Sequence, residues 1–158
     1  MLTAADIMTR SVVCAKPNDT VAIVARLLSD HDISAVPVCD ASGAVIGMIS
    51  EGDLIAPVGE QNIARRTWWL GLLADGMDLA PSFLDCIKVE NRSVGDLMVS
   101  PVITASPETT VPQLADLLVK HHVKRLPIVK DGKLVGIVSR ADLVQAFART
   151  PDAIVEAL

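Results

Sequence analysis

The sequence predicts a mixed fold of helices and strands (α/β, or α+β) that contains two copies of one β-α-β-β-α unit. The first observation is an internal duplication, because residues 6–55 recur as residues 96–144 with a shift of 90 positions (96 − 6 = 90). The second is that the shift falls to 89 after Pro37, where the second copy is one residue shorter in a turn. A length change confined to a turn is what a structural repeat allows.

The length of the chain indicates that the two copies share a core. The protein has 158 residues, and a repeat of about fifty residues is marginal alone. Although 51% of residues are hydrophobic, no apolar run approaches the roughly 18–20 residues of a membrane-spanning helix. Asp6 interrupts the start before a signal peptide can form. We therefore expect a cytoplasmic protein.

Each copy shows the same order of elements. A short apolar strand comes first, an amphipathic helix follows, and two strands separated by a turn lead into a second helix. We expect the first repeat over residues 1–56 and the second over residues 96–158, with their elements at residues 12–14, 21–28, 36–38, 45–49 and 50–55, and at 102–104, 111–118, 126–128, 134–138 and 139–147.

Local signals mark where these elements begin and turn. Thr110 and Gln113 have the spacing of a capping box at a helix start, and Asp131-Gly132 is a strong two-residue hairpin signal. Between the repeats, residues 57–95 form a separate insert. Its Trp68-Trp69 segment is apolar on most sides of a predicted helix, so the insert is expected to be helical.

Cysteine content and charge exclude several classes of protein. Cys14, Cys39 and Cys86 are odd in number and widely spaced, which favours three buried, reduced thiols over disulfides or a zinc site. The net charge is −5, and residues 1–56 hold 3 basic against 7 acidic residues. An acidic first repeat argues against a nucleic-acid groove.

The ordered set of motifs resembles the CBS domain. Each copy has Pro-x-x-Thr-Val before the first helix, His-x-x-x-x-x-Pro at the middle strand and Gly-x-x-Ser-x-x-Asp-Leu at the second helix. The whole set occurs twice, so the chain resembles a tandem CBS pair, or Bateman module. Residues 65–70 of the insert are also similar to bacterial CBS-pair proteins that continue into a BON domain. The sequence ends at Leu158, so we expect the pair without that domain.

The resemblance implies a regulatory module. In the family, two repeats pack about a pseudo-twofold axis and leave two clefts, which often bind AMP, ADP, ATP or S-adenosylmethionine, and two modules commonly form a homodimer. An effector protein would be a separate chain. We expect no enzyme, because the sequence has no G-x-S-x-G elbow, no Gly-rich phosphate loop and no H-E-x-x-H motif. The alternative is a ligand-independent dimerisation scaffold with the Trp68-Trp69 helix as its contact surface, and membrane binding is not expected.

The ligand-binding prediction centres on two equivalent serine and aspartate pairs. Ser50 and Asp53 open the second helix of the first repeat, and Ser139 and Asp142 open that of the second. A carboxylate can accept the ribose hydroxyls, while the helix N-terminus suits a phosphate. The same Ser-x-x-Asp spacing is also a helix cap, so both roles stay open.

Basic residues distinguish the two repeats. Lys124, Arg125 and Arg140 of the second repeat correspond to Ser34, Ala35 and Glu51 of the first. A phosphate needs compensating positive charge, so one cleft is expected to be competent and the other not. The sequence leaves open which aspartate shares a cleft with Lys124 and Arg125.

The resemblance also places adenine against apolar strand residues. Val13 and Cys14, or Ile103 and Thr104, are the candidates, although core packing explains such residues equally well. His122 faces either a phosphate or water. No metal ligands and no catalytic residues are predicted.

Overall fold

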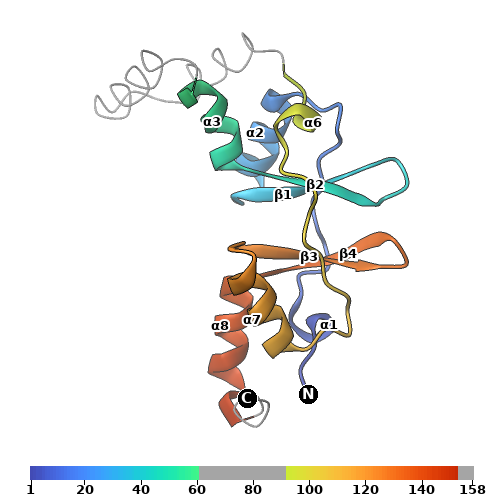
Figure 1. Cartoon of the computed structure of the whole chain (residues 1–158), viewed down its shortest axis with the longest axis vertical. Coiled ribbons are helices and arrows are strands. Elements are labelled where there is room, and N and C mark those ends of the chain that lie inside the picture. Colours follow the sequence, from blue (N-terminus) through green and yellow to red (C-terminus); the bar gives the residue numbers. More distant parts are fainter. Residues whose placement is uncertain (61–91, 153–158) are drawn as a thin grey trace. The chain divides into compact units, whose positions relative to one another are not determined.

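The computed structural model describes residues 1–60 and 92–152, and it confirms a mixed fold of helices and strands (Figure 1). Most of the predicted insert, including Trp68, Trp69 and Cys86, lies outside the described residues. In chain order the described elements are α1 (Ala4–Ile7), α2 (Val21–Asp30), β1 (Ala35–Cys39), β2 (Val45–Ser50), α3 (Glu51–Glu60), α6 (Val94–Leu97), α7 (Val111–Lys120), β3 (Arg125–Lys130), β4 (Lys133–Ser139) and α8 (Arg140–Arg149).

The chain divides into two compact units that do not follow the sequence halves. Unit 1 contains residues 1–13, 39–46 and 101–158, and unit 2 contains residues 14–38 and 47–100. The first helix, α1, thus belongs with the second copy of the repeat, and α6 belongs with the first copy. Helix α1 precedes the first copy in the sequence but completes the second copy. Helix α6 precedes the second copy but completes the first.

Unit 1 is built around the antiparallel pair of β3 and β4. A segment lies on each side of this pair, because Ala105 forms a parallel bridge to Ile128 and Thr9 forms an antiparallel bridge to Ile137. The Thr9 N–H donates to the Ile137 carbonyl at 2.9 Å, and the Ile137 N–H returns a bond at 3.0 Å. Residues from both ends of the sequence therefore flank one hairpin.

The core of unit 1 lies on one face of this hairpin. Opposite residues of an antiparallel pair share a face, and Leu126 and Val138 are such a pair, both fully buried. Helices α7, α8 and α1 cover them with apolar side chains that recur at helical spacing. The buried cluster comprises Ala4, Val111, Leu114, Leu118, Leu126, Ile128, Val138 and Leu143.

Unit 2 repeats this plan with the first copy of the sequence. All five residues of β1 are buried, and β1 and β2 form a two-stranded sheet, of which residues 35–38 and 47–50 lie in unit 2. From α6, the Val94 N–H donates to the Asp19 carbonyl at 2.9 Å, and just after it Val99 forms an antiparallel bridge to Met48. Val94 is fully buried, so α6 completes this core as α1 completes the other.

The predicted helix and turn signals are confirmed. Thr110 Oγ1 accepts from the Gln113 N–H at 3.5 Å, and Gln113 Oε1 accepts from the Thr110 N–H at 3.0 Å, which is a complete capping box. Asp131 and Gly132 both have positive φ, at 52° and 75°. That conformation is the one required by a two-residue hairpin of type I′.

Two details of the sequence prediction are wrong. The expected strands at residues 12–14 and 102–104 are not strands, since only the next residue of each copy, Ala15 or Ala105, forms a single parallel bridge. A parallel segment that follows the sheet for one residue gains too few ladder bonds to count as a strand. Cys39 is buried as expected, but Cys14 is exposed.

Candidate functional site

The end of β4 and the start of α8 present a serine and an aspartate in unit 1. Asp142 Oδ2 accepts from the Ser139 N–H at 2.7 Å and from Ser139 Oγ at 2.9 Å. The Asp142 N–H donates back to Ser139 Oγ at 3.3 Å. The pair is therefore a reciprocal cap that orients the first turn of α8, and both residues remain partly exposed.

Unit 2 contains the same arrangement at the start of α3. Asp53 Oδ2 accepts from the Ser50 N–H at 2.9 Å and from Ser50 Oγ at 3.0 Å, and the Asp53 N–H donates to Ser50 Oγ at 3.4 Å. The capping role foreseen for these residues is confirmed in both units. Because the backbone frames match, differences between the units reside in the surrounding side chains.

Three basic residues lie next to the cap of unit 1 along the backbone. Arg125 is the register partner of Ser139, so the two side chains lie on one face of the hairpin. The Arg140 N–H donates to the Lys124 carbonyl at 3.1 Å, which joins the start of α8 to the residue before β3. Lys124 and Arg140 are exposed, and Arg125 is half-buried. One edge of unit 1 thus combines a carboxylate with three cations.

The three aligned positions of unit 2 carry no cation. The Glu51 N–H donates to the Ser34 carbonyl at 2.9 Å, the counterpart of the bond between Arg140 and Lys124. Ser34, Ala35 and Glu51 replace the lysine and the two arginines. On the same backbone frame, unit 1 therefore carries three cations at these positions, and unit 2 carries one anion.

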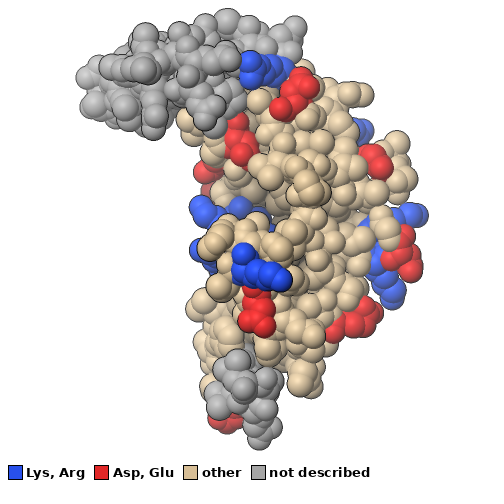
Figure 2. Space-filling view, viewed as in Figure 1, with Lys and Arg blue, Asp and Glu red and all other residues tan. Residues whose placement is uncertain are grey.

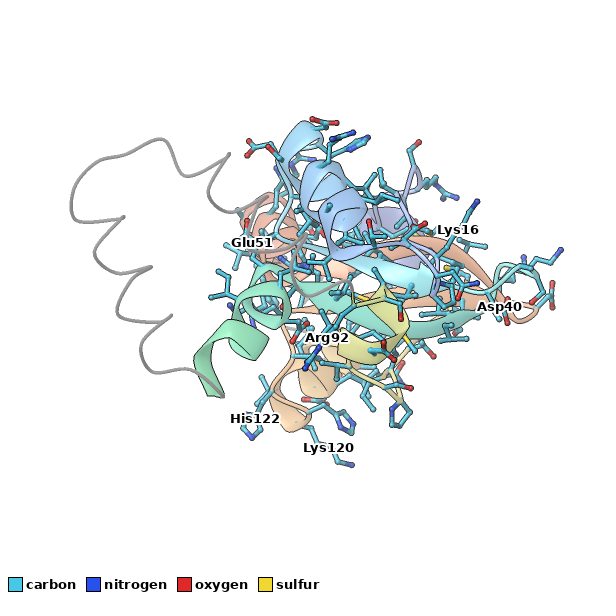
Figure 3. All side chains as sticks on the ribbon, turned by 90° about the horizontal axis from the view of Figure 1, so that it is seen from above. Lys16, Asp40, Glu51, Arg92, Lys120 and His122 are labelled. Atoms are coloured by element: carbon cyan, nitrogen blue, oxygen red, sulfur yellow. The ribbon has the colours of Figure 1, made fainter. Side chains whose placement is uncertain are left out.

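The remaining predicted residues are distributed over both units. Ile103 packs against the core cluster of unit 1, and Thr104 beside it is exposed. Val13 is the last residue of the first segment of unit 1, whereas Cys14 belongs to unit 2. His122 is exposed and has a positive φ of 52° in the turn after α7. Figure 3 shows His122 beside Lys120 at an outer edge.

In each unit a methionine side chain packs over a glycine of the hairpin, and this contact was not foreseen from the sequence. Met8 packs over Gly136 of β4 in unit 1, and Met98 packs over Gly47 of β2 in unit 2. A Cβ atom on Gly136 would lie 2.8 Å from Met8 Cγ, which is closer than such atoms come in proteins. The signal was present, because the methionines and the glycines are all matched between the two copies.

Within residues 1–60 and 92–152, no group of three or more His, Cys, Asp or Glu side chains is placed to hold a metal ion. In the same part of the chain, no helix has both the length and the apolar content needed to cross a bilayer.

A fold of two matched units, each presenting a capped helix at the end of a hairpin, defines a tandem-repeat binding module. The CBS domain family matches residues 4–59 and 94–149, and the chain belongs to this family. The uncharacterized protein MJ1426 of Methanocaldococcus jannaschii is 34% identical over 154 residues, which cover 90% of this chain and 89% of that protein.

Solved structures of CBS pairs share the fold. The crystal structure of CBSX2 in complex with AMP has a TM-score of 0.72 and 27% identity, and the match covers 96% of this chain and 99% of that one. CBSX2 comes from Arabidopsis thaliana. The CBS domain pair of protein MJ0100, solved with 5′-methylthioadenosine and S-adenosyl-L-methionine, has a TM-score of 0.71 and 23% identity, with coverage of 95% and 98%.

Proposed function

We propose that this protein is a regulatory module that binds an adenosyl nucleotide and acts as a homodimer on a separate effector protein in the cytoplasm. The observation that carries the proposal is the charged edge of unit 1, where Ser139 and Asp142 cap α8 opposite Arg125. The equivalent edge of unit 2 has no basic residue in the aligned positions. We therefore propose one phosphate-competent site in each chain.

We assign distinct roles to the two oxygens of Asp142. Both bonds from Ser139 go to Oδ2. A carboxylate offers about four lone-pair positions over its two oxygens, so Oδ1 is the atom that we assign to the ribose hydroxyls. Ligand binding and helix capping then use one side chain at the same time.

The phosphate is assigned to the start of α8. The first backbone N–H groups of a helix point toward an anion bound there, and the ten-residue helix α8 adds its dipole. Lys124, Arg125 and Arg140 supply charge-assisted hydrogen bonds. For adenine, we assign the partly exposed Val13 and the neighbouring pair of Ile103 and Thr104, all in unit 1.

The comparison with CBSX2 supports an adenosyl ligand, because that protein shares 27% of its sequence with this chain and was crystallised with AMP. The chain also spans 89% of MJ1426 and 99% of the crystallised chain of CBSX2, so the likeness concerns whole modules. A non-catalytic, regulatory role agrees with membership of the CBS family.

Calorimetry on the dialysed protein, together with a thermal-shift panel, tests this proposal. We expect one site for each chain and a stabilisation of about 2.7 kcal/mol at one hundred times the dissociation constant. Two equal sites for each chain would contradict the assignment to unit 1. Silence toward AMP, ADP, ATP and S-adenosylmethionine, with no nucleotide carried over from expression, would contradict the function itself.

Exposed apolar side chains favour a second candidate, a ligand-independent dimerisation scaffold. Val119 of α7 is 72% exposed and Val144 of α8 is 67% exposed, with Phe147 one turn beyond. The face seen in Figure 2 is also largely uncharged, with acidic and basic groups in small clusters. Calorimetry distinguishes the candidates, because both are expected to dimerise but only the sensor binds a nucleotide. Light scattering tests the scaffold surface, since Val144→Asp should separate the protomers.

A further inference from the structure

We propose that Met8 and Met98 are oxidation sites for hydrogen peroxide, and that conversion of either thioether to a sulfoxide releases its leading segment from the hairpin beneath it. The two methionines are equivalent in the repeat, and each lies directly over a glycine. The inference is independent of any ligand, because it concerns how α1 is held in unit 1 and how α6 is held in unit 2.

The side chain of each methionine occupies the place that a side chain on the glycine would take. A Cβ atom on Gly136 would meet Sδ of Met8 first, then its Cγ at 2.8 Å and its Cβ at 3.1 Å. A Cβ atom on Gly47 would meet the same three atoms of Met98, with Cγ and Cβ again at 2.8 and 3.1 Å. Both glycines are buried. Each unit therefore contains a close, apolar contact between a thioether and the backbone of a strand.

Both methionine side chains are also accessible to a small oxidant. Met8 and Met98 are half-buried, and the residue after each of them, Thr9 or Val99, is exposed. Each methionine thus combines a tight contact with the hairpin and access from solvent. Oxidation at such a position changes a packed side chain without prior unfolding of the protein.

The reaction transfers one oxygen atom to sulfur. A lone pair of the thioether attacks one oxygen of hydrogen peroxide, the O–O bond breaks as the S–O bond forms, and the other oxygen leaves as water after a proton shift. Sulfur loses two electrons, and the peroxide gains them. The product is a polar and chiral sulfoxide, which is bulkier than the thioether and disrupts packed apolar contacts. It therefore no longer suits the contact with a buried glycine.

The leading segments depend on tertiary contacts for their structure. Helices α1 and α6 have four residues each, whereas an isolated helix is marginal in water even at roughly 12–15 residues. The residue after each methionine pairs with the hairpin through two backbone hydrogen bonds. Thr9 and Ile137 exchange bonds of 2.9 and 3.0 Å, and Val99 and Met48 exchange bonds of 2.8 and 3.1 Å. Loss of the methionine contact acts on these bonds from one residue away.

Graded hydrogen peroxide on the full chain, followed by peptide mass spectrometry and by hydrogen exchange measured with NMR, tests the proposal. We expect sulfoxide at Met8 and Met98, with exchange of the Ile137 and Val99 N–H groups about five- to thirtyfold faster. Met1 is 80% exposed and serves as the reference for an unprotected methionine. Reaction at Met1 alone, or complete reaction at Met8 and Met98 with unchanged exchange, would overturn the proposal.

Leucine variants assign the effect to each unit. Met8→Leu keeps an apolar side chain but cannot form a sulfoxide, so peroxide should then accelerate exchange at Val99 and not at Ile137. Met98→Leu is the matched control, and it should confine the acceleration to Ile137. If the double variant responds to peroxide as the wild type does, oxidation at another side chain opens the segments, and the proposal is overturned.

Two further measurements do not depend on how well leucine fits. Met8→Gln places a polar side chain over Gly136, so it should accelerate exchange of the Ile137 N–H without peroxide, and unchanged exchange would contradict the proposed release. Methionine sulfoxide reductases of both stereospecificities, supplied with a thiol reductant, should restore slow exchange to the oxidised wild type. Exchange that stays fast after both sulfoxides are reduced would show that another lesion is the cause.

Discussion

The side chain of Met8 covers the backbone of Gly136, and the two residues come from opposite ends of the sequence. Gly136 is buried in β4, and a Cβ atom there would approach three atoms of the methionine side chain. The neighbouring bridge between Thr9 and Ile137 fixes the same crossing. The first segment of the chain is therefore attached to the hairpin that leads to the proposed ligand site.

Gly136→Ala is expected to destabilise the protein by about 1–3 kcal/mol, because added volume in a packed core forces neighbours to shift. Gly52→Ala is the control, since its nearest contact is the Ser50 Oγ at an ordinary 3.6 Å. Urea unfolding measures both variants. In a Met8→Ala background the cost of Gly136→Ala should shrink, and equal costs in the two backgrounds would contradict the packing explanation.

Removal of residues 1–10 is expected to destabilise unit 1 more than unit 2. The segment makes five backbone hydrogen bonds to residues 107–137 of unit 1, including Ala4 N–H to the Thr109 carbonyl at 2.8 Å. At about 1 kcal/mol for each bond, the loss is about 5 kcal/mol before the exposure of the core beneath Ala4 is counted. Hydrogen exchange should show greater loss of protection in α7 and β4 than in α2 and β1.

Arg10→Ala is the control for that truncation. It removes the exposed bond of 3.0 Å from the Arg10 side chain to the Ala5 carbonyl and a minor charge interaction with Asp6. We expect a change below about 1 kcal/mol. Equal loss of protection in both units after the truncation would show that the first segment does not stabilise unit 1 in particular.

Asp142→Ala and Asp53→Ala separate capping from ligand binding. Both carboxylates accept two bonds from the preceding serine at similar distances, so each variant should lose about 0.5–2 kcal/mol of stability. Only Asp142→Ala should weaken nucleotide binding, because the positions around Asp53 that align with Lys124, Arg125 and Arg140 carry no basic residue. Calorimetry measures the affinity and thermal unfolding measures the stability. Unchanged affinity in both variants would limit both aspartates to capping.

The stability conferred by Asp6 should be lost in acid. The Thr3 N–H, at 2.8 Å, and the Thr3 hydroxyl both donate to this carboxylate, which lowers the pKa of Asp6 below its ordinary value of 3.8. A group with a lowered pKa in the folded state stabilises the fold fully above its unfolded pKa, and this contribution is lost as the pH falls through the folded value. The stability that the Asp6 carboxylate contributes is therefore lost at pH values below about 4.

A carboxyl-carbon NMR titration measures this effect. The resonance of Asp6 should titrate at lower pH than those of ordinary exposed carboxylates. Asp40 should behave in the same way, because the Ser42 hydroxyl and the Ala44 N–H donate to it and lower its pKa. If Asp6 titrates with an ordinary pKa, its hydrogen bonds from Thr3 at the start of α1 do not form in solution.

Local chemistry made much of the fold predictable from the sequence. The capping box at Thr110, the turn at Asp131-Gly132 and the amphipathic helices depend on residues within four positions of one another, and all are confirmed. The role of Ser139 and Asp142 as a cap was equally local. Their role in ligand binding depends on a partner molecule, so it remains a prediction.

The assignment of α1 to unit 1 could not be read from the duplication. Met8 and Met98 are equivalent, as are Gly47 and Gly136, so the pattern allows either methionine to cover either glycine. Only the path of the chain decides that Met8 lies on Gly136 and Met98 on Gly47. The expected strands at residues 12–14 and 102–104 failed for a related reason, because their pairing depends on non-local partners.

The exchange of α1 and α6 between the two copies of the repeat has a consequence for the ancestry of the chain. A polypeptide with a single copy of the repeat would carry one hairpin, its two long helices and one short leading helix. Two such polypeptides would reproduce the contacts seen in units 1 and 2 by trading their leading helices, which is domain swapping. Gene fusion of that swapped pair would retain every contact and remove the dependence on protein concentration.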